Sequence, residues 1–228
     1  MKLSWRTELP AFAIVLAMWA LAVASWSVIP ARVPVHWNLQ GVADRWGGRA
    51  EALLLLPAIA TAMYALFPLL PRLDPGRANY EKFPGAFFAI RFAVVALVGA
   101  IFTAMVITYR GGPEAPRGFA LPAIGAVLIV IGNFMGKLRP NWFIGVRTPW
   151  TLSSKTSWTR SHRVGGWVFI AVGALFVLAG FVRAPWALGA ALGALLAGSL
   201  GVVVYSYFVW RSDPDKVPPA GTTPANDV

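Results

Sequence analysis

The stretch "APWALGAALGALLAGSLGVVVYSYFVW" (residues 184–210) carries no charged side chain over its 27 positions. A helix needs roughly 20 apolar residues to cross the hydrocarbon core of a bilayer, which is about 30 Å thick. Apolar runs of only about 10–14 residues are typical of buried helices in soluble proteins. The stretch therefore predicts a transmembrane helix, and it decides the class of fold.

Five further apolar runs reach or approach this length. They lie at 9–29, 52–70, 92–109, 118–136 and 164–182. Only 13% of the residues are charged, about half of the roughly 25% that is typical of soluble domains. Because Arg183 alone separates the last two runs, these should form an antiparallel helical hairpin. We predict an all-α integral membrane protein with six transmembrane helices.

The first run admits a second interpretation, a cleaved signal peptide. Lys2 and Arg6 precede it, and Ala22-Val23-Ala24 fits the small-residue pattern of a cleavage site. Its 21 apolar positions exceed the usual apolar region of about 7–15 residues in a signal peptide. The length favours a retained helix.

The distribution of Lys and Arg predicts the orientation in the membrane. With six helices both termini lie on one side, and 14 of the 20 Lys and Arg fall on that side. Because cytoplasmic loops carry the excess of basic residues, both termini should be cytoplasmic. The outer loop is then 30–50, and the loop 137–163 faces the cytoplasm. The net charge of +11 is spread over short loops, which favours contact with anionic lipids over direct binding to nucleic acid.

We divide the chain into four segments. These are an N-terminal domain with two helices and the outer loop (1–70), a connector with the third helix (71–118), a core of helices four to six (119–210) and a tail (211–228). The tail is polar and rich in proline and has almost nothing to bury, so we predict that it is disordered.

The inner loop and its flanks, "GNFMGKLRPNWFIGVRTPWTLSSKTSWTRSHRVGG" (132–166), contain six Lys and Arg, three Trp and no carboxylate. Pro140 ends the fourth helix, because proline cannot continue a helix. After a series of turns, Ser153 or Ser154 is placed to cap a short helix.

On that short helix Lys155, Thr159 and Arg163 follow one another at i, i+4 and i+8. Trp158 and His162 form a second i, i+4 pair. A basic stripe beside an aromatic one is typical of a helix that lies at a lipid interface. Anchoring to lipid is the simpler interpretation, and a docking surface for a partner is the alternative.

Arg147 beside Trp150 is a candidate binding residue, since a guanidinium can donate two parallel hydrogen bonds to a phosphate or a carboxylate. Catalysis is not favoured, because no carboxylate lies between residues 115 and 212 and the loop has no internal acid–base pair. His162 is its only plausible base. The chain has no cysteine, which excludes thiol catalysis and thiolate metal sites. We expect no enzymatic activity, no catalytic residue and no cofactor.

The outer loop, "PARVPVHWNLQGVADRWGGRA" (30–50), has too many prolines and glycines for a helix. His36, Asp44 and Glu51 could in principle meet as a metal site. Their spacings of eight and seven match no standard ligand pattern. We therefore expect no metal and a compact cap over the outer ends of the helices.

Arg91 lies one turn into the third helix. A charge at mid-bilayer costs about 2.5–3.5 kcal/mol on the insertion scale, so the side chain should not be deep. We expect it to snorkel to the inner interface.

The sixth helix carries a small residue at every fourth position: Gly189, Gly193, Ala197 and Gly201. Such stripes let helix backbones approach closely in a membrane. We expect packing within the chain, against the fifth helix. The alternative is a homodimer formed through these four residues.

The outer loop resembles the signature of a small bacterial membrane domain of unknown function, in which prolines precede a His-Trp/Phe-Asn triplet and a glycine and an aspartate follow. The matching residues are Pro30, Pro34, His36, Trp37, Asn38, Gly41, Asp44 and Trp46. We take the residues from Pro34 to Trp46 in this set as the outer candidate site.

The inner stretch is similar to the core motif of the SdpI family. The matching residues are Asn133, Gly136, Lys137, Pro140, Asn141, Gly145, Arg147, Thr148, Pro149, Trp150, Trp158, His162, Gly165 and Gly166. The residues expected to contact a ligand or partner are Asn133, Lys137, Arg139, Asn141, Arg147, Thr148, Pro149, Trp150, Trp158 and His162.

The resemblance implies immunity against a membrane-active peptide toxin and signalling to a soluble regulator, such as a transcriptional repressor held at the membrane. The expected partners are therefore membrane lipids, a peptide toxin outside and a soluble regulator inside. A small transporter or lipid-binding protein is the alternative. Buried ionisable residues would mark a transporter, and near the membrane boundaries the sequence offers only Arg91 and Asn133 as candidates.

Overall fold

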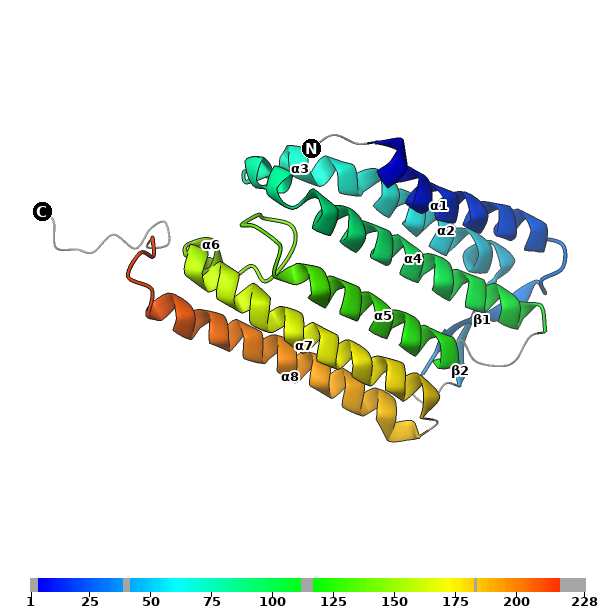
Figure 1. Ribbon diagram of the computed structural model, residues 1–228. Helices are drawn as coiled ribbons and strands as arrows, with labels where there is room; N and C mark the ends of the chain where they lie inside the picture. Colours follow the sequence, from blue (N-terminus) through cyan, green and yellow to red (C-terminus); the bar gives the residue numbers. More distant parts are fainter. Residues whose placement is uncertain (1–3, 39–41, 112–116, 183, 218–228) are drawn as a thin grey trace, which may run out of the picture.

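The structure is a computed structural model that describes residues 4–38, 42–111, 117–182 and 184–217. Long helices lie alongside one another in two groups, with a small hairpin at one end (Figure 1). The helices are α1 (Trp5–Ser25), α2 (Arg49–Leu66), α3 (Leu70–Leu73), α4 (Pro84–Tyr109), α5 (Arg117–Met135), α6 (Pro149–Leu152), α7 (Lys155–Phe181) and α8 (Pro185–Arg211). Two 3-10 helices, η1 (Phe67–Leu69) and η2 (Arg77–Lys82), flank α3, and the strands are β1 (Arg32–Trp37) and β2 (Ala43–Gly48).

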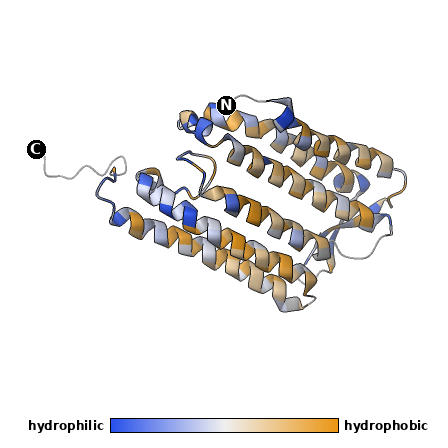
Figure 2. Ribbon diagram, viewed as in Figure 1, coloured by the Kyte–Doolittle hydropathy of each residue, from blue (hydrophilic) through white to orange (hydrophobic). Residues whose placement is uncertain are grey.

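In the described part of the chain, five helices are long and apolar enough to cross a membrane. They are α1, α2 continued through α3 (Arg49–Leu73), α4, α7 and most of α8 (Trp186–Arg211). The colouring in Figure 2 shows hydrophobic residues along these helices. The apolar part of α5, Phe119–Met135, is shorter, at about 25 Å for a rise of 1.5 Å per residue. The prediction of a multi-helix membrane protein is therefore confirmed, with five candidate spans rather than six of full length.

Two helices begin earlier than the apolar runs predicted. α4 begins at Pro84 and not near residue 92, because proline suits the first turn of a helix. α7 begins at Lys155 and continues without a break into the predicted span at 164–182. The separate interfacial helix that we predicted is thus the first part of a 27-residue helix.

The two groups of helices meet through α5. α1, α2 and α4 pack together, α7 packs between α5 and α8, and α5 lies against both α4 and α7 (Figure 1). The core of the first group contains Ala11, Val15 and Met18 of α1 together with Leu53 and Phe102.

The contact between α5 and α7 is unusually close because glycines face each other. A Cβ atom added at Gly132 would lie 2.6 Å from the carbonyl oxygen of Gly166, and one added at Gly166 would lie 2.7 Å from that of Gly132. Gly125 and Gly173 form a second reciprocal pair, seven residues along each helix. We call these four residues the glycine seam. Backbones in direct contact are the packing that small residues make possible in a membrane.

The stripe on α8 does not have this role. Gly189, Gly193, Ala197 and Gly201 are all exposed, and a Cβ atom at each of the three glycines would meet no atom within 4 Å. The prediction that this stripe packs within the chain is wrong. α8 instead meets α7 at other positions, among them Gly198, which faces Val168. The alternative, a homodimer through the stripe, stays a prediction.

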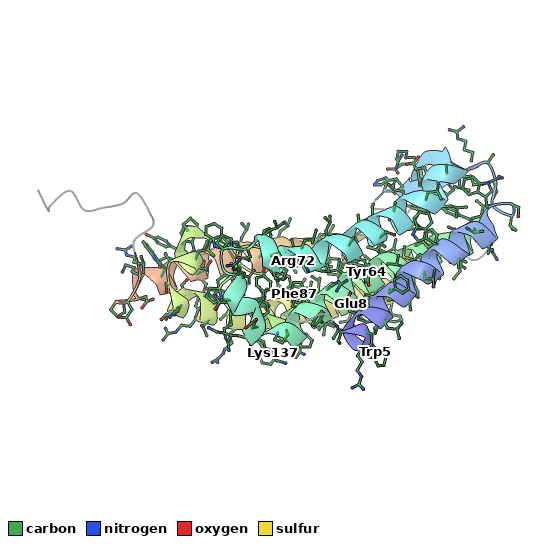
Figure 3. All side chains as sticks on the ribbon, turned by 90° about the horizontal axis from the view of Figure 1, so that it is seen from above. Trp5, Glu8, Tyr64, Arg72, Phe87 and Lys137 are labelled. Carbon is green, nitrogen blue, oxygen red and sulfur yellow. The ribbon has the colours of Figure 1, made fainter. Side chains whose placement is uncertain are left out.

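Arg91 does not snorkel. Its side chain is buried and donates two hydrogen bonds, of 2.7 and 2.9 Å, to the carboxylate of Glu8. It donates a third, of 2.9 Å, to the carbonyl oxygen of Tyr64 on α2. That carbonyl would normally accept from residue 68, but Pro68 has no N–H to donate. Glu8 and Tyr64 lie close together in Figure 3, where α1 meets α2. Glu8 and Tyr64 lie 83 and 27 residues from Arg91, so nothing in the local sequence indicated these partners. We therefore expected the unpaired charge to lie at the interface.

The outer loop forms a two-stranded antiparallel sheet, so the all-α class that we predicted needs qualification. Within the segment that we predicted as the tail, the backbone N–H of Val217 donates to the carbonyl of Ser153 at 3.0 Å. Residues 218–228 lie outside the described part of the chain.

The glycine seam should be sensitive to a single added side chain. We expect Gly132→Val to lower the free energy of unfolding by about 1–3 kcal/mol or more, because overpacking displaces backbone. Gly193→Val on the open face of α8 is the matched control and should be close to neutral. Thermal unfolding of both variants in detergent checks this, and equal midpoints would contradict the assigned packing.

The buried ion pair should behave as a unit. Arg91→Met leaves the Glu8 carboxylate without its partner, and we expect a loss of about 3–5 kcal/mol. Replacing both residues, as Glu8→Leu with Arg91→Met, should recover a large part of that loss. Denaturant unfolding of the two single variants and the double variant gives the coupling energy, and strictly additive effects would rule out the pair.

Candidate functional site

The outer hairpin has one face on the helices and one face away from them. Val33 is buried, and Val35 and Trp37, which share its face, pack against the same core. The hydroxyl of Tyr109 on α4 donates to the carbonyl oxygen of Pro34 at 2.8 Å. Trp46 on β2 is 52% exposed. The hairpin is thus fixed to the bundle while it presents an aromatic side chain outward.

Two pairs of side chains lie within hydrogen-bonding distance on the hairpin and at the start of α2. His36 Nδ1 lies 2.5 Å from a carboxylate oxygen of Asp44, and Arg45 donates to Glu51 at 2.6 Å. Because the Glu51 carboxylate accepts from Arg45, it does not join His36 and Asp44 in the metal site that we considered from the sequence. Within the described residues no group of three or more His, Cys, Asp and Glu could hold a metal ion.

Asn38 closes the hairpin. Its side-chain oxygen accepts from the backbone N–H of Val42 at 2.9 Å, and its own N–H donates to the carbonyl of Val42 at 2.9 Å. Gly41, which we also predicted for this site, lies outside the described residues.

A cavity of about 360 Å³ lies under the hairpin, between the two groups of helices. We call it the outer cavity. It is lined by Val35, His36, Trp37, Asn38, Arg45, Glu51, Ala52, Leu55, Leu56, Ile101, Met105, Ala120 and Leu188. Of the residues predicted for the outer site, His36, Trp37 and Asn38 therefore share one site, whereas Trp46 faces away.

The inner loop is built around the buried side chain of Asn141. Its oxygen accepts from the N–H groups of Phe143 and Ile144 at 3.0 and 2.7 Å. Its amide donates to the carbonyls of Arg139 and Ile144 at 2.9 and 3.0 Å. A side chain with all these bonds shapes the turn and is not free to bind a ligand.

The carboxylate that this loop lacks comes from the connector between α3 and η2. Asp74 accepts from the N–H of Trp142 at 2.9 Å and from the hydroxyl of Tyr80 at 2.7 Å. Burial and the hydrogen bond to Asp74 raise the pKa of Tyr80 well above its ordinary value, so the phenol remains a donor. Asn79 adds a bond of 2.8 Å to the carbonyl of Pro140.

Trp158 and His162 are buried in the protein and do not face lipid, which corrects our prediction of an aromatic interfacial stripe. Their rings stack at 4.0 Å between centroids, and Trp158 donates to the carbonyl of Leu138 at 3.0 Å. Lys155, Thr159 and Arg163 are exposed, as predicted.

Both ring nitrogens of His162 are occupied. The backbone N–H of Val146 donates to Nε2 at 3.1 Å, so Nδ1 carries the proton and donates to the carbonyl of Trp158 at 2.7 Å. Gly145 has a φ of +114°, and a Cβ atom there would overlap the imidazole. With its acceptor nitrogen engaged, His162 has no free lone pair with which to act as a base.

The short helix α6 is hydrogen-bonded to α8 near the C-terminal end of α8. Thr148 caps it by accepting from the N–H of Thr151, and the indole N–H of Trp150 donates to the hydroxyl of Ser206. Pro149 occupies its first position, which suits proline. These residues have structural partners within the chain.

The start of α7 is hydrogen-bonded to the tail. Ser154 is the cap that we predicted, because its side chain accepts from the N–H of Ser157 at 2.8 Å. Its hydroxyl also donates to the carboxylate of Asp213. That hydrogen bond lowers the pKa of Asp213. The tail therefore supplies a second carboxylate to the inner loop.

Five predicted inner residues are exposed: Asn133, Lys137, Arg139, Arg147 and Pro149. Arg147 donates to the carbonyl of Trp142 at 2.8 Å, which holds its guanidinium beside the loop. The inner motif thus separates into a buried set that shapes the loop and an exposed, mostly basic set.

Sequence reasoning missed the residues that complete the loop from other segments, which are Asp74, Tyr80, Ser206 and Asp213. It also missed Thr151 within the loop, whose hydroxyl donates to the carbonyl of Val146. The turn sequence Asp74-Pro75-Gly76 was the one local signal, since an aspartate before proline and glycine often bonds to the following backbone. Gly76 N–H does donate to Asp74, at 2.6 Å.

Comparisons with known proteins agree with the two resemblances. Residues 137–209 match the model of the SdpI/YfhL protein family. Residues 13–61 match the model of a domain of unknown function (DUF1648). The searches of curated proteins and of solved structures found no match. The first segment runs from the inner loop through most of α8, and the second covers most of α1, the hairpin and most of α2.

Asn141 and Asn133 provide a matched test of the inner loop. Asn141→Ala leaves two or more backbone groups without partners, at about 1–3 kcal/mol each, so we expect a clear loss of stability and faster tryptic cleavage within 137–147. Asn133→Ala removes an exposed amide and should change neither. Equal cleavage rates for the two variants would show that Asn141 does not hold the loop.

Proposed function

We propose that this chain, which carries an SdpI/YfhL segment after a DUF1648 segment, protects a bacterial inner membrane against a membrane-active peptide. In this proposal the chain crosses the membrane six times, α5 included, with both termini in the cytoplasm. The SdpI/YfhL match supports it, because immunity is what a resemblance to the SdpI family implies.

The arrangement of the ends supports the proposed sidedness. The end of α8 and both short helices α3 and α6 lie at one end of the bundle and the hairpin lies at the other, and α1 runs toward the hairpin end (Figure 1). Most Lys and Arg belong to the first end, which favours the cytoplasm for it. At about 25 Å, the apolar part of α5 is near the lower limit for a crossing.

The observation that carries the proposal is the outward face of the hairpin. It holds Trp46 and Val42, both more than half exposed. Aromatic side chains are enriched where proteins bind other chains. Because the opposite face is fixed by Val33 and by the Tyr109 bond, the surface is rigid and would lose little entropy on binding a peptide.

We further propose that the protein binds without catalysing a reaction. The ring nitrogens of His162 and the carboxylates of Asp74 and Asp213 all have structural partners. On the inner side, the exposed residues Lys155 and Arg163 support contact with anionic lipid or with a soluble regulator.

Expression in a sensitive bacterial strain tests this function. We expect the natural chain to raise the inhibitory concentration of at least one membrane-active peptide in a panel. Trp46→Ala should abolish most of that gain, because aromatic anchors contribute about 2 kcal/mol or more to interfaces. Trp26→Ala, at an exposed tryptophan just after α1, is the control and should protect as the natural chain does.

Two outcomes would count against the proposal. If the inserted natural chain protects against no peptide in the panel, the immunity function is wrong for this protein. If Trp46→Ala and Trp26→Ala protect equally well, the hairpin face is not the receiving surface.

A further inference from the structure

The outer cavity lies at the depth where lipid chains begin. Ala52 and Leu56 lie three and seven residues after the start of α2, and Met105 and Ile101 lie four and eight residues before the end of α4. At 1.5 Å per residue, the lining extends from roughly 5 to 12 Å inside the outer ends of the helices. This is the boundary between headgroups and hydrocarbon when the helices span a bilayer.

The lining changes from polar to apolar along the same direction. The hairpin and the first turn of α2 contribute His36, Asn38, Arg45 and Glu51 at the outer end. Farther along α2 and α4 the lining is apolar, from Leu55, Leu56, Ile101 and Met105, and Leu188 of α8 adds a further apolar side chain. A lipid has the same order of a polar group above an apolar chain.

The cavity reaches the surface of the bundle. Leu55 lines it and is 49% exposed, so this side chain borders both the cavity and the outside of α2. A chain from the surrounding bilayer can therefore enter from the side.

The mouth carries both signs of charge. Arg45 and Glu51 are paired at 2.6 Å, and His36 is paired with Asp44. A headgroup with a single negative charge would be attracted by Arg45 but repelled by the carboxylate of Glu51. A zwitterionic headgroup offers a phosphate to Arg45 and an ammonium group to Glu51.

We infer that the outer cavity binds one acyl chain of a zwitterionic phospholipid, phosphatidylethanolamine in chemical class, from the outer leaflet. The chain lies between α2, α4 and Leu188 of α8, and the headgroup lies at Arg45 and Glu51. Since Ala120 and Leu188 belong to the second group of helices, a bound chain fills the space between the two groups. The site is on the inner face of the hairpin, so the inference does not depend on protection against a peptide.

Photolabelling of the full chain in nanodiscs tests this site. The probe is phosphatidylethanolamine with a diazirine in one acyl chain, diluted in phosphatidylglycerol. We expect labelled residues within 49–56 and 101–105. Leu55→Trp should reduce this labelling about tenfold, the effect of losing about two buried methylene groups.

The controls are adjacent residues. Leu54→Trp, on the same turn of α2 but outside the lining, should label as the natural chain does. If Leu55→Trp fails to fold, Leu188→Trp replaces it, with Gly189→Trp as its control, because Gly189 faces open space. Equal labelling in a variant and its control would overturn the site.

A second arm tests the headgroup. A phosphatidylglycerol probe with the same chain should label the cavity less than the phosphatidylethanolamine probe, and Arg45→Gln with Glu51→Gln should remove the difference. Equal labelling of the natural chain by both probes would overturn the zwitterionic assignment. Labelling by a diazirine-bearing apolar peptide, with none by either lipid, would overturn the assignment of a lipid.

Discussion

The close contact between the backbones of α5 and α7 is the constraint on which the rest of the structure depends. Lipid is as apolar as the helix surfaces, so helices in a bilayer are held together by packing and not by the hydrophobic effect. The glycine seam gives α5 that packing although the apolar segment of α5 is shorter than any of the five candidate spans. Because α5 also lies against α4, α5 joins the two groups of helices, and the seam fixes α5 to α7.

The seam also determines where the inner loop can form. Gly132 is close to the end of α5, and Gly166 is in the first half of α7, so their contact brings the two ends of the loop together. Within that limited space the backbone turns around Asn141, and Gly145 makes room for His162. The basic loop then obtains its carboxylates from Asp74 and Asp213, which fasten the connector and the tail to it. Residues that looked like a binding motif therefore serve largely to fold the loop.

The apolar runs were sufficient to predict the helices and the general class, because crossing a membrane requires length and composition that few other structures need. Pairing between distant residues could not be predicted in the same way. The partner of Arg91 is Glu8, 83 residues away. For a guanidinium without a known partner, the interface is the position with the lowest desolvation cost, and so we predicted that position. The regular spacing on α8 was more conspicuous than the seven-residue spacing of Gly125 and Gly132, yet only the latter faces another helix. Of the candidate site, the outer triplet His36-Trp37-Asn38 was found from its motif, while the cavity below it depends on helices far apart in sequence.

Magic-angle spinning NMR on the protein in lipid bilayers tests the seam most directly. With glycine labelled at Cα and at the carbonyl carbon, the account predicts direct cross-peaks between Gly132 and Gly166 and between Gly125 and Gly173. Absence of both, in a sample whose sequential glycine contact Gly165–Gly166 is visible, would contradict the packing of α5 on α7 and with it the placement of the inner loop.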